Sequence, residues 1–249
     1  MKSTVIALMA SVALTCPAQA FDVSAMSPSE KDAFGAAVRT YLLENPETLT
    51  DAIQVLRNRE EAQARADQKA FVKVNAKEIF ENPNSYVGGN PDGDVTVVEF
   101  VDFQCPWCVR AHAEVKNLLA ADKNIRFITK DIPLQGEDAA LKSRFAVAAR
   151  LKLGNDAYGA VMDDLFTLRG NVSEESLRRL AQSKNLDPDA FMPHMESAEV
   201  TAKIEEDMAL FQRLGLNGTP AFIFGDDLNP GYLPVAEMQN RVNALRDAN

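Results

Sequence analysis

Two cysteines separated by two residues, Cys105 and Cys108 in the run Cys-Pro-Trp-Cys, are the side chains best suited to chemistry in this sequence. Thiol–disulfide exchange needs an attacking thiolate and a second thiol that resolves the mixed disulfide, and this pair supplies both. A disulfide across two intervening residues closes almost no loop, so it adds little stability by chain-entropy reasoning. The remaining cysteine, Cys16, lies in a predicted export signal. We therefore interpret the pair as a redox-active centre.

Cys105 lies where a predicted strand, Val95 to Phe103, gives way to a predicted helix, Pro106 to Ala121. The free N–H groups and the positive dipole end at the start of a helix favour a thiolate. In such positions the pKa of a cysteine falls from about 8.5 to between roughly 3.5 and 7.5. We predict that Cys105 is the nucleophile and that Cys108, one turn further into the helix, resolves the mixed disulfide.

Four neighbouring residues are candidates for supporting or bystander roles. Pro106 withholds one N–H from the thiolate, and Trp107 adds bulk and apolar surface. Glu99 stands among apolar strand residues. It is either buried, with a raised pKa and a role in relaying the proton of the resolving thiol, or it faces water at the strand end. Asp102 is expected to be solvated.

A metal site would be an alternative use of the cysteines. His112 follows Cys108 by four positions, so Cys105, Cys108 and His112 could converge on an ion. Structural zinc normally takes four ligands, and the only other histidine is His194. A copper(I) site formed by the two thiolates remains open, because soft thiolates suit copper(I). We expect no resident metal, and His112 is expected to be a polar residue on the helix surface.

The first twenty residues have the features of a signal peptide. Lys2 supplies the positive charge, residues 5–14 are an apolar run too short to span a bilayer, and Ala18-Gln19-Ala20 predicts cleavage after Ala20. The mature protein is expected in an oxidising compartment, the periplasm if the source is Gram-negative. The formal net charge of −10 argues against nucleic acid or an anionic membrane as a partner.

Residues 21–75 are predicted to form a helical arm and linker. Ser27 to Glu30 reads as a capping box with proline at the first helical position. Leu49, Ile53 and Leu56 then follow at spacings of four and three, which is typical of a short coiled-coil seam. The arm either packs on its own domain or, over residues 27–70, joins copies of the chain. We favour oligomerisation, because so thin an apolar stripe buries little on one chain.

The rest of the chain predicts an α/β fold with a helical insertion. Expected elements are a loop over residues 82–94, with a short strand left open at its edge, a strand over 125–132, helices over 137–214, a strand over 220–224, a turn cluster over 226–231 and a closing helix over 234–246. Thr219-Pro220 precedes the last strand, where proline cannot donate to the ladder and the peptide bond could be cis.

Taken together, these features resemble the thioredoxin-fold DsbA family. The resemblance rests on the run from Glu99 to Cys108, followed by Gly218-Thr219-Pro220-Ala221-Phe222. The capped N-terminal helices, the loop of residues 82–93 and the segment of residues 130–134 look more like its ScsC branch (suppressor of copper sensitivity protein C) and the Com1-like proteins. The resemblance covers essentially the whole mature chain.

The resemblance implies a thioredoxin fold with a helical insertion, spanning residues 76–249. It makes Cys105 the exposed nucleophile, makes Pro220 cis and has Thr219 present backbone groups to an extended substrate. It aligns Glu99 with the buried acid of the family. The redox-active Cys105–Cys108 disulfide is the only redox group expected, with no other cofactor.

The leading functional hypothesis is an oligomeric disulfide isomerase that acts on exported cysteine-containing proteins, with a redox partner in the membrane. Pro-Trp between the cysteines departs from the Pro-His of the strongest oxidases of the family, and Thr219 departs from their valine. Two alternatives stay open. One is a monomeric DsbA-like dithiol oxidase, and the other is a copper-binding thiol protein.

Overall fold

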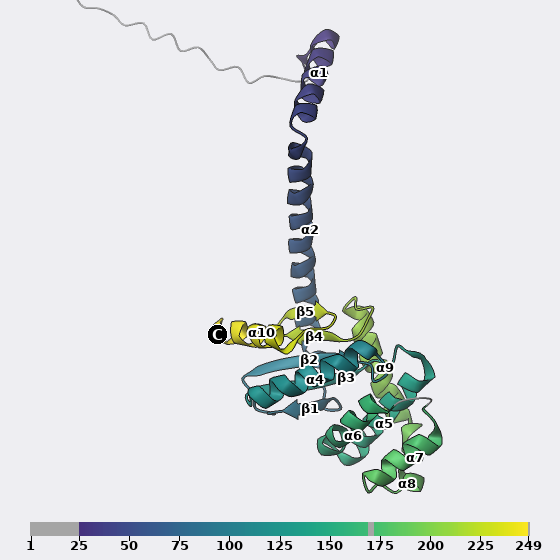
Figure 1. Cartoon of the computed structure of the whole chain (residues 1–249). Helices are drawn as coiled ribbons and strands as arrows, with labels where there is room; N and C mark the ends of the chain where they lie inside the picture. The colour runs from purple at the N-terminus through teal and green to yellow at the C-terminus, as the bar shows by residue number, and fades with distance from the viewer. Residues whose placement is uncertain (1–24, 169–171, 249) are drawn as a thin grey trace, which may run out of the picture. The chain divides into compact units, whose positions relative to one another are not determined.

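A computed structural model describes residues 25–168 and 172–248 (Figure 1). The predicted signal peptide, residues 1–20, lies outside the described residues. The chain divides into two compact units, residues 1–60 and residues 61–249. Within the described parts, every helix is either too short or too polar to cross a membrane.

The elements follow one another in an order that places a helical block inside an α/β domain. The helices are α1 Pro28–Glu44, α2 Glu47–Val74, α3 Ala76–Phe80, α4 Pro106–Ala121, α5 Gly136–Leu153, α6 Asn155–Thr167, α7 Glu174–Ser183, α8 Pro188–Met195, α9 Ala198–Arg213 and α10 Val235–Asp247. The strands are β1 Tyr86–Gly89, β2 Val95–Val101, β3 Ile125–Asp131, β4 Ala221–Phe224 and β5 Asp227–Pro230.

The first helix begins where the sequence predicts it. Ser27 caps α1 with the expected capping box, and the Glu30 carboxylate accepts a hydrogen bond from the Ser27 N–H at 2.8 Å. None of the residues in α1 is buried. Along the first half of α2, Leu49, Ile53 and Leu56 keep about half of their surface exposed, at 51%, 51% and 55%. Within its own unit, the apolar stripe is therefore left about half exposed.

The sheet has five strands in the order β1-β3-β2-β4-β5. The central strands β2 and β3 are parallel, with Val95 opposite Ile125 and Val101 opposite Asp131. The remaining neighbours are antiparallel. Because α4 connects β2 to β3, the end of β2 leads directly to the start of α4. This connection places the two cysteines at one end of the central strand.

Helices cover both faces of the sheet, so the central strands are almost continuously buried. On one face, Val97, Phe127 and Phe222 pack against α4 and α10. On the other face, Val98 and Phe100 pack with apolar residues of α3, α9 and the last turns of α2. The burial of β2 on both faces matters for any charged side chain that it carries.

The helices α5 to α9 form the predicted insertion between β3 and β4, and Figure 1 shows them gathered beside the sheet. A group of buried charges lies between them and β3. The Lys130 Nζ donates to the Glu78 carbonyl oxygen at 2.6 Å and lies 3.8 Å from Asp207 Oδ1. Asp207 also pairs with Lys203 and accepts from the Asp131 N–H at 3.1 Å. This buried ionic cluster ties the insertion to the sheet.

Two short elements differ from the sequence prediction. The turn cluster predicted over 226–231 contains β5, whose register sets Ile223 opposite Leu228. Residues 76–80 form the separate helix α3. The loop predicted over 82–94, where a short edge strand was left open, contains β1, which pairs with β3. Both edge strands are four residues long, and β5 follows β4 after residues 225–226 alone.

Candidate active site

Cys105 is the N-cap of α4, and Pro106 is the first helical residue, as the sequence predicts. Both Cys105 and Cys108 are free thiols. Cys108 is fully buried, whereas Cys105 keeps 4% of its surface exposed. The prediction that Cys105 is exposed is therefore wrong. Cys105 is the more accessible of the two sulfurs, but it is largely covered because its Sγ lies against the loop that precedes β4.

The two thiols have opposite electrostatic environments. Hydrogen bonding to Cys108 lowers the pKa of Cys105 to about 6, against the opposing effect of partial burial. Burial, reinforced by the hydrogen bond to Cys105, raises the pKa of Cys108 far above its usual value. At neutral pH the pair therefore holds one thiolate, on Cys105, and one thiol, on Cys108. This is the division of charge that exchange chemistry needs.

The loop before β4 completes the site from far along the chain. The Thr219–Pro220 peptide bond is cis, as the resemblance implies. The carbonyl oxygen of Thr219 lies 3.3 Å from the Sγ of Cys105. The carbonyl oxygen of Pro220 accepts a hydrogen bond from the Gly231 N–H at 2.9 Å, which fastens this loop to the end of β5.

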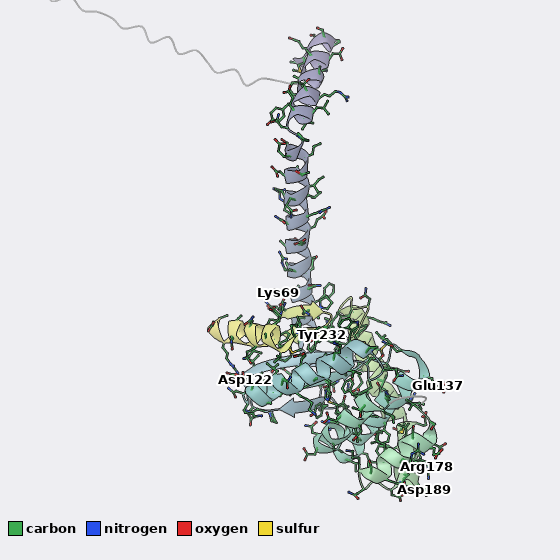
Figure 2. All side chains as sticks on the ribbon, in the orientation of Figure 1. Lys69, Asp122, Glu137, Arg178, Asp189 and Tyr232 are labelled. Carbon is green, nitrogen blue, oxygen red and sulfur yellow. The ribbon has the colours of Figure 1, made fainter. Side chains whose placement is uncertain are left out.

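A cleft of about 370 Å³ opens beside the nucleophile. Its lining residues are Trp107, Thr219, Pro220, Gly231 and Tyr232. Trp107 is 52% exposed, and its ring lies 5.7 Å from the ring of Tyr232, which is labelled in Figure 2. An aromatic wall and the half-buried Thr219 thus flank Cys105.

Glu99 is fully buried in β2, and this excludes the alternative in which it faces water. Its neighbours in register are Thr129 of β3 and Phe222 of β4. Neither carboxyl oxygen has a hydrogen-bond partner among the described residues, and the same holds for the Thr129 hydroxyl. Burial raises the pKa of Glu99 to about 8, so the side chain is mainly protonated at neutral pH. Its charge, when present, raises the pKa of Cys108 further.

Asp102 is the clearest error of the sequence prediction, which placed it in solvent. The residue is fully buried. One carboxylate oxygen accepts from the Gln104 N–H at 2.7 Å, and the other accepts from the N–H groups of Leu134 and Gln135 at 2.8 and 2.9 Å. It therefore ties the loop that leads to Cys105 to the segment that follows β3, which no local pattern reveals.

His112 is also more buried than predicted, with 13% of its side chain exposed. It lies 2.5 Å from Asp163 Oδ1 and stacks on Phe166 at 4.4 Å between ring centroids. It thus joins α4 to α6. Among residues 25–168 and 172–248, no three histidine, cysteine or acidic side chains are grouped to hold a metal ion.

Sequence reasoning missed Tyr232 of the cleft wall and Arg110, which lies against that ring. Tyr232 lies in a turn-rich segment without periodicity, and Arg110 is one of many charged residues on helix surfaces. Their guanidinium-to-ring distance of 5.5 Å follows only from the way β5 and α10 fold back on α4.

This chain is similar to known protein families and to solved structures. The model of the DSBA-like thioredoxin domain matches residues 96–243, and the model of the copper resistance protein ScsC N-terminal domain matches residues 30–63. A thioredoxin-like oxidoreductase from Silicibacter pomeroyi DSS-3 is 42% identical, with a TM-score of 0.65, and the match covers 70% of this chain and 98% of that one.

Two further comparisons differ in how much of each chain they cover. Salmonella enterica Typhimurium BcfH is 26% identical, with a TM-score of 0.70 over 86% of this chain and 95% of that one. A curated Na(+)/H(+) antiporter NhaA 1 of Salinispora arenicola (strain CNS-205) is 31% identical over 64% of this chain, which spans only 24% of that protein. The family match, which takes in both cysteines and the cis-proline loop, shows that this chain belongs to the DsbA-like thioredoxin family and carries an ScsC-type N-terminal domain.

Proposed function

We propose that this protein is a disulfide isomerase of exported proteins, that it acts in the periplasm after removal of residues 1–20, and that residues 27–70 join several copies. The observation that carries the proposal is the uncovered apolar stripe on α2, together with an activated thiolate at Cys105. Reshuffling requires that a misfolded substrate be held through several exchange steps. Linked copies hold it more tightly than one copy does.

The chemistry balances without a net change of oxidation state. The Cys105 thiolate attacks a non-native disulfide, so a mixed disulfide forms and one substrate sulfur leaves as a thiolate. A different substrate thiolate then attacks the mixed disulfide and releases Cys105. If no substrate thiolate attacks, Cys108 does, which frees the reduced substrate and leaves a Cys105–Cys108 disulfide. A thiol reductant, expected at the membrane, must then regenerate the dithiol.

Glu99 and Thr219 have supporting roles in this proposal. Cys108 must lose its proton before it can attack, and the buried Glu99 carboxyl is the acid–base group that β2 sets near it. Thr219 presents its backbone beside Cys105, where an extended substrate segment can dock. The cysteine loop of a membrane redox partner would use the same edge.

The experiment is reactivation of scrambled ribonuclease by the mature protein. It is compared with Cys105→Ser and with a triple variant of the stripe, Leu49→Asp, Ile53→Asp and Leu56→Asp. A matched control places the same three charges at polar positions of α2, namely Gln54→Asp, Asn58→Asp and Gln63→Asp. We expect the mature protein and the control to sediment as oligomers and to reactivate the enzyme.

The stripe variant should sediment as a monomer and lose reactivation while still exchanging disulfides with small thiols, and Cys105→Ser should be inactive. A monomeric mature protein, or full reactivation by the stripe variant, would overturn the proposal.

A dithiol oxidase is the second candidate, and the low pKa of Cys105 is the observation that favours it. A stabilised thiolate favours the reduced form of the centre, which makes the Cys105–Cys108 disulfide more oxidising. In the same experiment, an oxidase would oxidise reduced ribonuclease in stoichiometric amounts and would not reactivate the scrambled form.

A further inference from the structure

The aromatic wall beside Cys105 carries an exposed cation. Arg110 follows Trp107 by one helical turn, and its guanidinium carbon lies 4.9 Å from the Trp107 ring centroid and 5.5 Å from that of Tyr232. Both rings line the cleft next to the nucleophile. Contact with both rings holds the exposed guanidinium group at the edge of this wall.

Arg110 has no acidic partner within the described ranges. Its natural partner on α4 is Glu114, four positions later. That carboxylate is already engaged, because it accepts from the Tyr232 hydroxyl at 3.0 Å and from the Val235 N–H at 3.1 Å. Glu114 thus fastens the loop before α10 to α4 and leaves Arg110 without a salt bridge.

We propose that Arg110 is a specificity-determining residue, which selects substrate segments with an acidic side chain close to the reacting cysteine. The inference rests on the proposed function, in which exported proteins present an extended segment to Thr219. Such a segment reaches Cys105 beside the Trp107–Tyr232 wall. An Asp or Glu flanking its cysteine then meets the guanidinium edge, whereas a Lys or Arg is repelled.

The test uses symmetric disulfide dimers of a short, blocked peptide with one cysteine. The residue next to the cysteine is Glu, Gln or Lys, on either side in separate peptides. Reduced protein attacks the dimer through Cys105 and releases one peptide thiol. Cys108 then releases the second, so two electrons pass from the dithiol to the peptide disulfide. Rates of peptide-thiol release are divided by those with dithiothreitol, which removes the intrinsic reactivity of each peptide.

We expect the full-length protein to prefer Glu over Lys, by roughly two- to fivefold at low salt, because the pair is exposed. Arg110→Gln should abolish the preference while keeping the rate with the Gln peptide. Arg110→Lys should keep part of it, since the charge remains without the planar stack. The matched control is Arg179→Gln, because Arg179 is an exposed arginine of α7 that pairs with Glu175.

Equal normalised rates for the Glu and Lys peptides, or the same preference in Arg110→Gln, would overturn the inference and leave the exchange activity standing. Failure of every peptide to react would instead overturn the proposed function.

Discussion

The Sγ of Cys105 lies 3.3 Å from the carbonyl oxygen of Thr219, although 114 positions separate the two residues in the chain. The contact joins the start of α4, which follows β2, to the loop before β4, and these two strands are neighbours in the sheet. It sets the nucleophile directly beside the backbone that an extended substrate would follow. Reactivity and docking are therefore expected at one place.

The ionisation of Cys105 is expected to depend on Cys108. The pKa of Cys105 is lowered to about 6, chiefly by hydrogen bonding to Cys108. Alkylation of Cys105 should therefore rise with a midpoint near pH 6 in the reduced protein. In Cys108→Ala the midpoint should move up toward the ordinary value, about 8.5. Cys108→Ser keeps a hydroxyl donor and should move it less. Equal midpoints in the wild type and Cys108→Ala would contradict this assignment.

Glu99 is expected to make the protein less stable as the pH rises. The pKa of its carboxyl is raised from the usual 4.5 to about 8 in the folded chain. The unfolded chain therefore releases this proton first, and stability present below pH 4.5 is lost as the pH rises toward 8. The loss is at most about 1.4 kcal/mol for each pH unit.

The measurement for Glu99 is urea unfolding between pH 5 and pH 8. Glu99→Gln should remove this part of the slope and be the more stable protein at pH 8. Asp131, whose pKa burial raises to about 7, titrates in the same window, so only the difference between wild type and variant is informative. Glu205→Gln, at an exposed position of α9, should keep the wild-type slope.

Loss of the Asp102 carboxylate is expected to loosen two loops at once. Asp102→Ala leaves the N–H groups of Gln104, Leu134 and Gln135 without their acceptor. Each unsatisfied buried group costs about 1–3 kcal/mol, and water reaching the loops will offset part of that. Asp102→Asn keeps one acceptor oxygen and should lose less. Amide hydrogen exchange should quicken at Leu134 and Gln135, and unchanged protection there would contradict the role given to Asp102.

Removal of Asp207 is expected to destabilise the domain strongly. Asp207→Leu leaves Lys130 and Lys203 buried without their anion. Breaking a buried ion pair in this way costs about 3–5 kcal/mol. Adding Lys130→Met and Lys203→Met should restore much of the loss, because no buried lysine is then left without its counter-charge. Urea unfolding of the single and triple variants measures both free energies of unfolding. An unchanged free energy of unfolding in Asp207→Leu would show that the cluster contributes little.

The sequence predicted the central elements well, because their signals are local. Pro106 at the first helical position and the apolar run before it marked the boundary at Cys105. Strand β5 was missed, because its four residues, Asp227–Pro230, are mostly of types typical of turns and depleted in strands. Strand β1 stayed open, since it takes its register from the distant strand β3. Glu99 stayed ambiguous until both faces of β2 were seen to be covered.

The errors at the site share one physical origin. Asp102 looks like a polar residue at a strand end, and only the segment after β3, folding over it, supplies donors for its oxygens. The cleft wall also depends on a remote segment, because Tyr232 reaches Trp107 only after the chain has passed through the whole insertion. Contacts between remote segments leave no periodic trace in a sequence.

The ionic cluster around Asp207 also bears on how this fold can be recombined. A helical block inserted into a thioredoxin scaffold looks like a cassette that could be exchanged between relatives. Here the block contributes Lys203 and Asp207 to a charge balance that the strand residue Lys130 completes. If a grafted block lacked the aspartate, that lysine would stay buried without a counter-charge. Strand and block must therefore be inherited, or engineered, as a matched set.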